Sequence, residues 1–322
     1  MNDDMQSFLD LLGVGGPFDP PSDMAAFRQA YAKTRAKLAG GSGSGMARKK
    51  VIIPTAWGRL VATIFRSDAP TSVLSPALVY FHGGGWTLGS AETHRPLLEY
   101  YTSNSDLVVI ALDYALAPEV PFPGALIQGL TALSWLRGNA DTLGIDGQRI
   151  AVGGDSAGAN LAVAVCLAAR DMGAPLPVAA MLAYGSFDSD PSRPSYREYD
   201  GDQYLLTAQK MAWFWNNYAP NPTVRTNPLA APLRADLSVM PPIQLTIAGL
   251  DILRDENLVF AANAQKAGVS IDVVLIEDGV HGFMEAVGIS ATCRKAVDHQ
   301  LAWINQVNGK VARSGGSVAQ IG

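Results

Sequence analysis

Short apolar runs alternate with longer amphipathic segments along most of the chain. The apolar runs are typical of buried strands, and the spacing of leucines and alanines between them is typical of helices. The predicted strands span 51–54, 60–65, 77–81, 107–113, 149–153, 178–184, 243–248 and 271–276. The predicted helices between them span 124–138, 157–171, 254–267 and 289–307. This order predicts an α/β fold with a mostly parallel central sheet and helices on both faces.

Three segments depart from this alternation. Residues 1–39 contain two apolar clusters at helical spacing, and the Gly/Ser run 40–45 after them is typical of a flexible connector. Residues 185–240 are rich in Pro, Asp, Asn and Ser and contain a single predicted helix at 208–218. We interpret this stretch as an insertion at the carboxyl edge of the sheet. Residues 309–322 are predicted to form a flexible tail.

Composition and charge exclude several classes of protein. The 322 residues are 48% hydrophobic and 16% charged, and the net charge is -5. This apolar content excludes wholesale disorder, and the mild acidity argues against a nucleic-acid partner. The two cysteines, Cys166 and Cys293, lie far apart without a CxxC motif, so we expect reduced, buried thiols and no metal site.

The chain starts with the acidic residues Asp3 and Asp4 where a secretory signal would be basic. Its longest apolar run, 161–169, is too short to span a membrane. We therefore expect no membrane span and a soluble protein in the cytoplasm.

A candidate nucleophile lies between a predicted strand and a predicted helix. Residues 154–158 read Gly-Asp-Ser-Ala-Gly, which matches the G-x-S-x-G pattern of a nucleophile elbow. Small neighbours are needed because the serine sits on a sharp, strained turn. The start of the following helix also favours developing negative charge. Ser156 is therefore the predicted nucleophile.

A His-Gly-Gly-Gly-Trp run at 82–86 follows the predicted strand 77–81. Consecutive glycines let the backbone turn several N–H groups toward one point, as an oxyanion hole requires. The alternative is a flexible glycine loop. His82 itself is interpreted as a structural hydrogen-bonding residue.

A serine nucleophile needs a general base, and the chain has four histidines. His281 lies in a turn just after the predicted strand 271–276, at the sheet edge where the elbow also ends. His94 and His299 are expected on the surface. His281 is therefore the predicted base.

The base in turn needs an orienting acid. Asp251 comes directly after the predicted strand 243–248. Asp255 and Glu256 are its rivals, but one helical turn further on they are expected to point to solvent. The order Ser156, Asp251, His281 along the chain is that of α/β-hydrolases.

Five motifs together resemble the hormone-sensitive-lipase-like family of α/β-hydrolase esterases. They are His-Gly-Gly-Gly-Trp at 82–86, Asp-Tyr-Ala-Leu-Ala-Pro-Glu at 113–119, Gly-Asp-Ser-Ala-Gly-Ala-Asn at 154–160, Asp-Ile-Leu-Arg-Asp-Glu at 251–256 and His-Gly-Phe at 281–283. The resemblance runs from about residue 50 to 307. Ala115 and Gln128 stand where the family usually has Arg and Asp, which puts local packing in question rather than the reaction.

The resemblance implies an α/β-hydrolase fold with a helical cap in two parts. The cap would consist of residues 1–45 and 185–235, and the catalytic domain of 46–184 and 236–308, followed by the tail 309–322. Dimers are common among similar enzymes, so a homodimer is a possible assembly.

The resemblance also implies a serine carboxylesterase that hydrolyses short- to medium-chain carboxylic esters through an acyl-enzyme. Ser156, His281 and Asp251 would form the triad. The amides of Gly83, Gly84 and Ala157 would form the oxyanion hole, with no cofactor or metal. An amidase, a lactonase or a deacetylase could use the same triad. A ligand receptor on this fold is disfavoured because the histidine is present.

Candidate substrate-binding residues lie beside these motifs. Trp86 adjoins the glycine loop, and Asp155 precedes the nucleophile. Trp213 and Phe214, with Trp215 and Tyr218, lie on the predicted helix 208–218. The aromatic rings either pack the cap or line the substrate pocket, and Asp155 has local hydrogen bonding as its alternative role.

Overall fold

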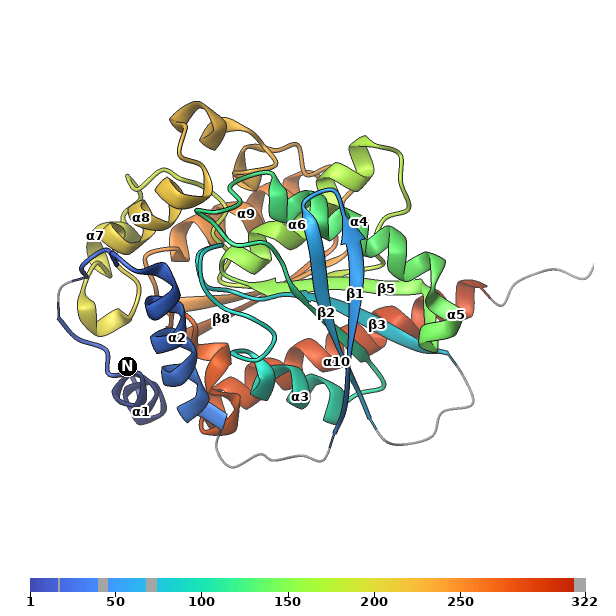
Figure 1. Ribbon diagram of the computed structural model, residues 1–322, viewed down its shortest axis with the longest axis horizontal. Coiled ribbons are helices and arrows are strands. Elements are labelled where there is room, and N and C mark those ends of the chain that lie inside the picture. Colours follow the sequence, from blue (N-terminus) through green and yellow to red (C-terminus); the bar gives the residue numbers. More distant parts are fainter. Residues whose placement is uncertain (17, 40–45, 68–73, 316–322) are drawn as a thin grey trace, which may run out of the picture.

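A computed structural model describes residues 1–16, 18–39, 46–67 and 74–315 of the chain (Figure 1). The predicted connector 40–45 lies outside these residues. Among the described residues, every helix is too short or too polar to pass through a membrane.

All eight predicted strands are present in one sheet. The order is β1-β2-β4-β3-β5-β6-β7-β8, with β1/β2 and β2/β4 antiparallel and the other neighbours parallel. The mostly parallel sheet predicted from the alternation is therefore confirmed. The strands are β1 (Ala47–Thr55), β2 (Gly58–Arg66), β3 (Ser75–Phe81), β4 (Val108–Asp113), β5 (Ile145–Asp155), β6 (Ala180–Ala183), β7 (Ile243–Leu250) and β8 (Ile271–Val280).

Helices cover both faces of this sheet (Figure 1). They are α3 (Arg95–Ser103) and α10 (Ala291–Gly315) on one face, and α4 (Gly124–Gly138), α6 (Ala157–Asp171) and α9 (Arg254–Lys266) on the other. Strand β3 illustrates how both faces of the sheet are covered: all seven of its residues are buried. Val79 and Phe81 face the core under α4 and α6, whereas Leu78 and Tyr80 face the core under α3 and α10.

Helices α3 and α10 differ from the sequence prediction. Helix α3 was not predicted, although its Arg-Pro start places proline in the first turn, where it is tolerated. Helix α10 continues to Gly315, past the predicted end at 307 and into the predicted tail 309–322. Residues 316–322 of that tail lie outside the described residues.

The N-terminal helices and the insertion lie side by side at one end of the sheet (Figure 1). They touch directly, because the Trp213 ring packs edge-on against Phe18 and Phe27, with ring centroids 5.4 and 6.0 Å apart. Their helices are α1 (Asp3–Leu12), α2 (Met24–Arg35), α7 (Ser195–Glu198) and α8 (Ala208–Tyr218). This arrangement fits a two-part cap; the domain boundaries stay predictions.

Short helical turns complete the chain. They are α5 (Ala140–Leu143), η1 (Ala36–Ala39), η2 (Asp202–Tyr204), η3 (Pro222–Thr226), η4 (Pro232–Arg234) and η5 (Phe283–Gly288). Of these, η5 directly follows the turn that carries His281.

Helix α2 is anchored to the body by Arg28. Its guanidinium donates to the Thr87 and Ala117 carbonyls, both at 2.9 Å, and forms two bonds to the Glu119 carboxylate. Thr87 follows the glycine-rich run 82–86, and Glu119 ends the motif 113–119. One side chain of the N-terminal segment therefore links both motifs.

Candidate active site

Ser156 lies at the junction of β5 and α6 in a strained backbone conformation. Its φ of 54° is unusual for a residue with a side chain. Glycine is required on both sides because β3 passes close by. A Cβ on Gly158 would lie 1.9 Å from the Phe81 carbonyl oxygen, and one on Gly154 would lie 2.5 Å from it. The sharp turn predicted from G-x-S-x-G is present.

Ser156, His281 and Asp251 form a continuous line of hydrogen bonds. The Ser156 Oγ lies 2.9 Å from His281 Nε2, and His281 Nδ1 lies 2.7 Å from Asp251 Oδ2. The three residues follow β5, β8 and β7, whose carboxyl ends meet at one edge of the sheet. With its proton on Nδ1, the imidazole can accept the serine proton at Nε2. The sequence therefore predicted a set that the fold brings together.

The acidic rivals of Asp251 have other partners. Glu256 is fully buried, so its predicted exposure is wrong: its carboxylate accepts the amides of Phe187 and Asp188, at 2.6 and 3.3 Å. Asp255 accepts the Ser195 amide at 2.9 Å. Both carboxylates face the insertion that packs over the first turn of α9. Burial raises the pKa of Glu256 well above its ordinary value.

The glycine loop is held from several sides. The Tyr114 hydroxyl donates to the His82 carbonyl at 2.7 Å, and the Leu88 amide donates to the Gly84 carbonyl at 2.8 Å. The Gly83 amide donates to Asp155 Oδ1 at 2.9 Å. Because this N–H already has an acceptor, the geometry does not favour the predicted oxyanion role of Gly83.

Three other amides remain available at this place. Gly84 and Gly85, which line the cavity, and Ala157, at the first position of α6, donate their N–H groups to no other atom of the described residues. Gly84 and Gly85 have φ values of 113° and 59°, which favour glycine. The sequence prediction named Gly84 and Ala157 but not Gly85, although Gly85 follows Gly84 in the same motif.

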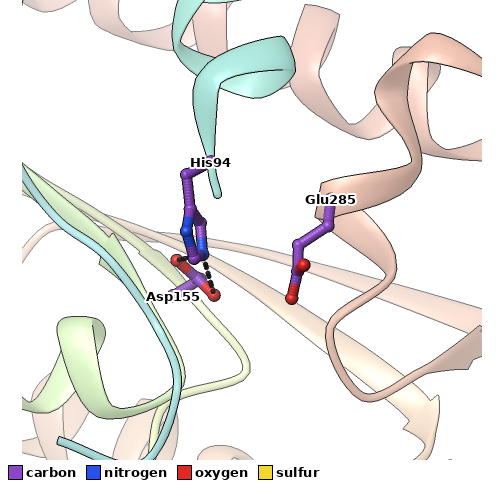
Figure 2. A group of neighbouring side chains, drawn as sticks. All are labelled: His94, Asp155 and Glu285. Carbon is purple, nitrogen blue, oxygen red and sulfur yellow. Dashed lines mark hydrogen bonds and ion pairs between the residues drawn. The ribbon is translucent and has the colours of Figure 1, made fainter. Parts of the chain in front are cut away.

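Asp155 is a buried acceptor rather than a free carboxylate. It accepts the Tyr80 hydroxyl at 2.8 Å, and His94 Nε2 lies 3.3 Å from it (Figure 2). Burial alone would raise the pKa of Asp155, but the charge and hydrogen bond of His94 outweigh it and lower that pKa. The predicted surface position of His94 is therefore wrong, because the residue is buried as the partner of Asp155.

Glu285 faces this pair from η5 (Figure 2). The donor atoms of His94, Asp155 and Glu285 lie within 4.8 Å of one another. Each carboxylate already has a partner in the chain. His94 lies beside Asp155, and Arg35 Nε lies 2.8 Å from Glu285 Oε2. We therefore assign no metal ion to this group.

A cavity of about 380 Å³ opens above Ser156 and His281. Its walls come from both cap segments and from the glycine loop. The apolar wall residues are Leu12, Val14, Phe18, Phe27, Leu88, Leu205, Leu206, Met211 and Phe214. The polar and charged wall residues are Asp19, Tyr31, Arg35, Asp155, Lys210 and Glu285.

The predicted aromatic residues divide between packing and cavity. Phe214 lines the cavity. Trp86 is buried, stacks on Tyr218 with ring centroids 4.1 Å apart, and lies outside the described cavity wall, as does Trp213. Trp86 and Trp213 pack against neighbouring rings, which favours the packing role over the substrate contact for both.

Sequence reasoning missed the charged wall residues Arg35, Lys210 and Glu285. The available signal was spacing: Lys210 lies four residues before Phe214, and Tyr31 lies four residues before Arg35. Residues four apart share one face of a helix.

The comparisons with known proteins agree with this geometry. The sequence model of a family described as having the alpha/beta hydrolase fold matches residues 78–285. The chain is 36% identical to carboxylesterase NlhH of Mycobacterium tuberculosis over 70% of this chain and 72% of that one. It is 32% identical to an ethyl acetate hydrolase of Pseudomonas putida over 88% and 92% of the two chains.

Solved structures are similar over nearly the whole length. A hyperthermophilic esterase from the archaeon Pyrobaculum calidifontis superposes with a TM-score of 0.90 at 34% identity, covering 96% of this chain and 99% of that one. Fold, motifs and relatives therefore agree. The chain belongs to the hormone-sensitive-lipase-like family of α/β-hydrolases and is a carboxylic ester hydrolase.

Proposed function

We propose that the chain hydrolyses short- to medium-chain carboxylic esters by serine catalysis, with Ser156 as nucleophile, His281 as general base and Asp251 as orienting acid. One observation carries the proposal. It is the unbroken hydrogen-bond line from Ser156 through His281 to Asp251, beneath a cavity large enough for a small ester.

In the acylation step, Ser156 Oγ forms a bond to the ester carbonyl carbon while its proton passes to His281 Nε2. The bond between that carbon and the alcohol oxygen then breaks, and His281 returns the proton to the leaving oxygen. A water molecule attacks the acyl-enzyme with the same proton transfers. One ester and one water give one acid and one alcohol, and Ser156 is restored.

Asp251 is suited to holding the imidazole during these transfers. It is buried, with 1% of its surface exposed, and it also accepts the Leu253 amide at 2.9 Å. A fixed carboxylate beside Nδ1 selects one tautomer and stabilises the imidazolium that forms.

The oxyanion hole is proposed to consist of the amides of Gly84, Gly85 and Ala157. Gly85 takes the place of Gly83, whose amide is bound to Asp155. Preorganised donors of this kind are typically worth about 2.7–4 kcal/mol each in the transition state.

Cavity size and lining support short to medium acyl chains. A volume of about 380 Å³ lies near the low end of the range for small-molecule sites. The apolar walls from both cap segments favour aliphatic groups. The Pseudomonas putida relative, named an ethyl acetate hydrolase, supports a small ester as well.

An amidase, lactonase or deacetylase would use the same triad and stays the alternative for the scissile bond. Because the chain is a carboxylic ester hydrolase, the receptor alternative is set aside. A cytoplasmic location and a homodimer stay predictions.

The test is hydrolysis of p-nitrophenyl esters from acetate to dodecanoate, together with one p-nitroanilide of matched acyl length. We expect kcat/KM to peak at a short or medium chain and to fall for dodecanoate. The anilide should react at least about 100-fold more slowly, which corresponds to roughly 2.7 kcal/mol in the barrier. A faster reaction with the anilide, or no release of nitrophenol, would overturn the proposal.

A further inference from the structure

Helix α8 presents Lys210, Met211 and Phe214 to the cavity. Phe214 lies directly over the glycine loop, since a Cβ on Gly85 would meet its ring at 2.1 Å. Lys210 is one helical turn earlier on the same face, so its Cβ is about 5–6 Å from that of Phe214. A cationic side chain therefore stands within a short reach of the proposed oxyanion hole.

The neighbours of Lys210 connect it to the turn of His281. Its Nζ donates to the Leu205 carbonyl at 2.7 Å. The Leu205 side chain lies against Gly282, where a Cβ would be 3.5 Å from it. Gly282 directly follows His281. Lys210 thus belongs to the part of the cavity wall beside the general base.

The charges in this wall leave Lys210 without an ionic partner. Arg35 is paired with Glu285, and His94 with Asp155. Among the ion pairs of the described residues, none includes Lys210. Asp19, the remaining acid of the wall, is exposed. An ammonium has three protons, so one carbonyl leaves two of them for a ligand.

The immediate surroundings of Lys210 leave room for a negative partner at its ammonium group. Burial lowers the pKa of Lys210, Asp202 opposes this effect, and the positive charge of Arg35 adds to it. A negative group beside the ammonium would favour its charged form and so counter the effects of burial and of Arg35 on the pKa of Lys210. The aliphatic wall from Met211 and Phe214 would contact the chain that carries this group.

We propose that Lys210 binds a carboxylate of the substrate, so that the enzyme prefers esters with a carboxylate on a short aliphatic arm over the matching neutral esters. This inference rests on the proposed esterase function. The carboxylate could belong to the acyl part, as in a dicarboxylic acid monoester, or to the alcohol part, as in the ester of a hydroxy acid.

Matched substrates separate these two sources. Monoethyl adipate is compared with ethyl hexanoate for the acyl side, and 6-acetoxyhexanoate with hexyl acetate for the alcohol side. Acid release is followed by titration at constant pH. The variants are Lys210→Met, which removes the charge, and Lys210→Arg, which keeps it. Lys266→Met, at an exposed position in α9, is the control.

Wild type is expected to have a higher kcat/KM for the charged ester of at least one pair. Lys210→Met should lower that preference about 10-fold or more, as expected for the loss of a charge-assisted hydrogen bond. Lys210→Arg and Lys266→Met should retain most of it. The substrate pair in which the preference for the charged ester falls identifies the side of the ester that carries the carboxylate.

Salt provides a test on the unaltered protein. Raising the ionic strength should lower kcat/KM for the preferred charged ester and leave its neutral partner unchanged. If Lys210→Met lowers kcat/KM equally for the charged and the neutral ester of a pair, Lys210 only holds Leu205. That result would overturn the inference. A wild-type preference for the neutral ester in both pairs would overturn it too. Failure to hydrolyse any of the four esters would instead count against the proposed function.

Discussion

The Gly83 amide donates to the Asp155 carboxylate at 2.9 Å, which ties the glycine-rich loop to the turn that carries Ser156. The two residues are 72 positions apart in the sequence. Asp155 is fixed in turn by the Tyr80 hydroxyl and by His94. We therefore propose that Asp155 positions the proposed oxyanion hole and does not touch the substrate carbonyl.

Replacing Asp155 tests this positioning role. Asp155→Ala should lower kcat about 10- to 100-fold, because the loop amides would no longer be held toward the carbonyl. KM should change little. Asp155→Asn keeps an acceptor oxygen for Gly83 and should recover most of the loss in kcat. The measurement is steady-state kinetics on a nitrophenyl ester.

Asp113 offers a matched control, because its carboxylate accepts the Ala91 amide at 2.6 Å and lies outside the described cavity wall. Asp113→Ala should reduce the free energy of unfolding but leave kcat unchanged. An equal kcat in Asp155→Ala and wild type would remove the positioning role.

The buried carboxyl group of Glu256 should make the stability of the protein depend on pH. Burial raises its pKa well above the ordinary value, so the folded protein keeps a proton that the unfolded chain releases above about pH 4.5. The contribution of this group is full below the unfolded pKa and declines as the pH rises toward the folded pKa. Glu256→Gln has no such proton to lose.

The free energy of unfolding of wild type and Glu256→Gln should therefore be compared by urea denaturation at pH 5 and pH 8. The free energy of unfolding of Glu256→Gln, relative to that of wild type, should be higher at pH 8 than at pH 5. A difference between the two proteins that is the same at both pH values would show that Glu256 ionises normally in the folded state.

Gln128 and Ala115, the two departures from the family pattern, contact one another. Gln128 Oε1 accepts the Ala115 amide at 2.6 Å, and its Nε2 donates to the Trp57 carbonyl at 3.2 Å. Gln128→Ala would leave both groups without this partner and should reduce the free energy of unfolding by about 1–3 kcal/mol. Activity per folded molecule should stay the same.

The comparison for this variant is Gln148→Ala, whose side chain is exposed and whose effect should be within about 0.5 kcal/mol. Thermal and urea unfolding would report the difference. Equal stability of the two variants would mean that the Gln128 contacts add nothing to the fold.

The fold could be predicted from the sequence because strand and helix periods are local. The eight apolar runs reflect the burial of single strands, and the small residues around Ser156 reflect one sharp turn. Both depend on residues that are close together in the sequence. The proximity of the proposed triad residues was predictable for the same reason, since Ser156, Asp251 and His281 each follow a strand whose end is visible in the sequence.

What could not be predicted depends on contacts between distant segments. The burial of His94 requires Asp155, and the burial of Glu256 requires the amides of Phe187 and Asp188. The use of the Gly83 amide likewise depends on Asp155. Periodicity along one segment carries no information about such partners. For the same reason Lys210 was not recognised as a cavity residue.

The most direct measurement for the central claim is covalent labelling of the nucleophile. Wild type and Ser156→Ala are incubated with a p-nitrophenyl alkylphosphonate, and the adduct is located by mass spectrometry of the peptides. We expect one phosphonyl group per chain on Ser156 and loss of esterase activity in step with labelling. Ser156→Ala should show neither labelling nor activity, with an unchanged circular dichroism spectrum. An adduct on another residue, or ester hydrolysis that survives in folded Ser156→Ala, would contradict the central claim.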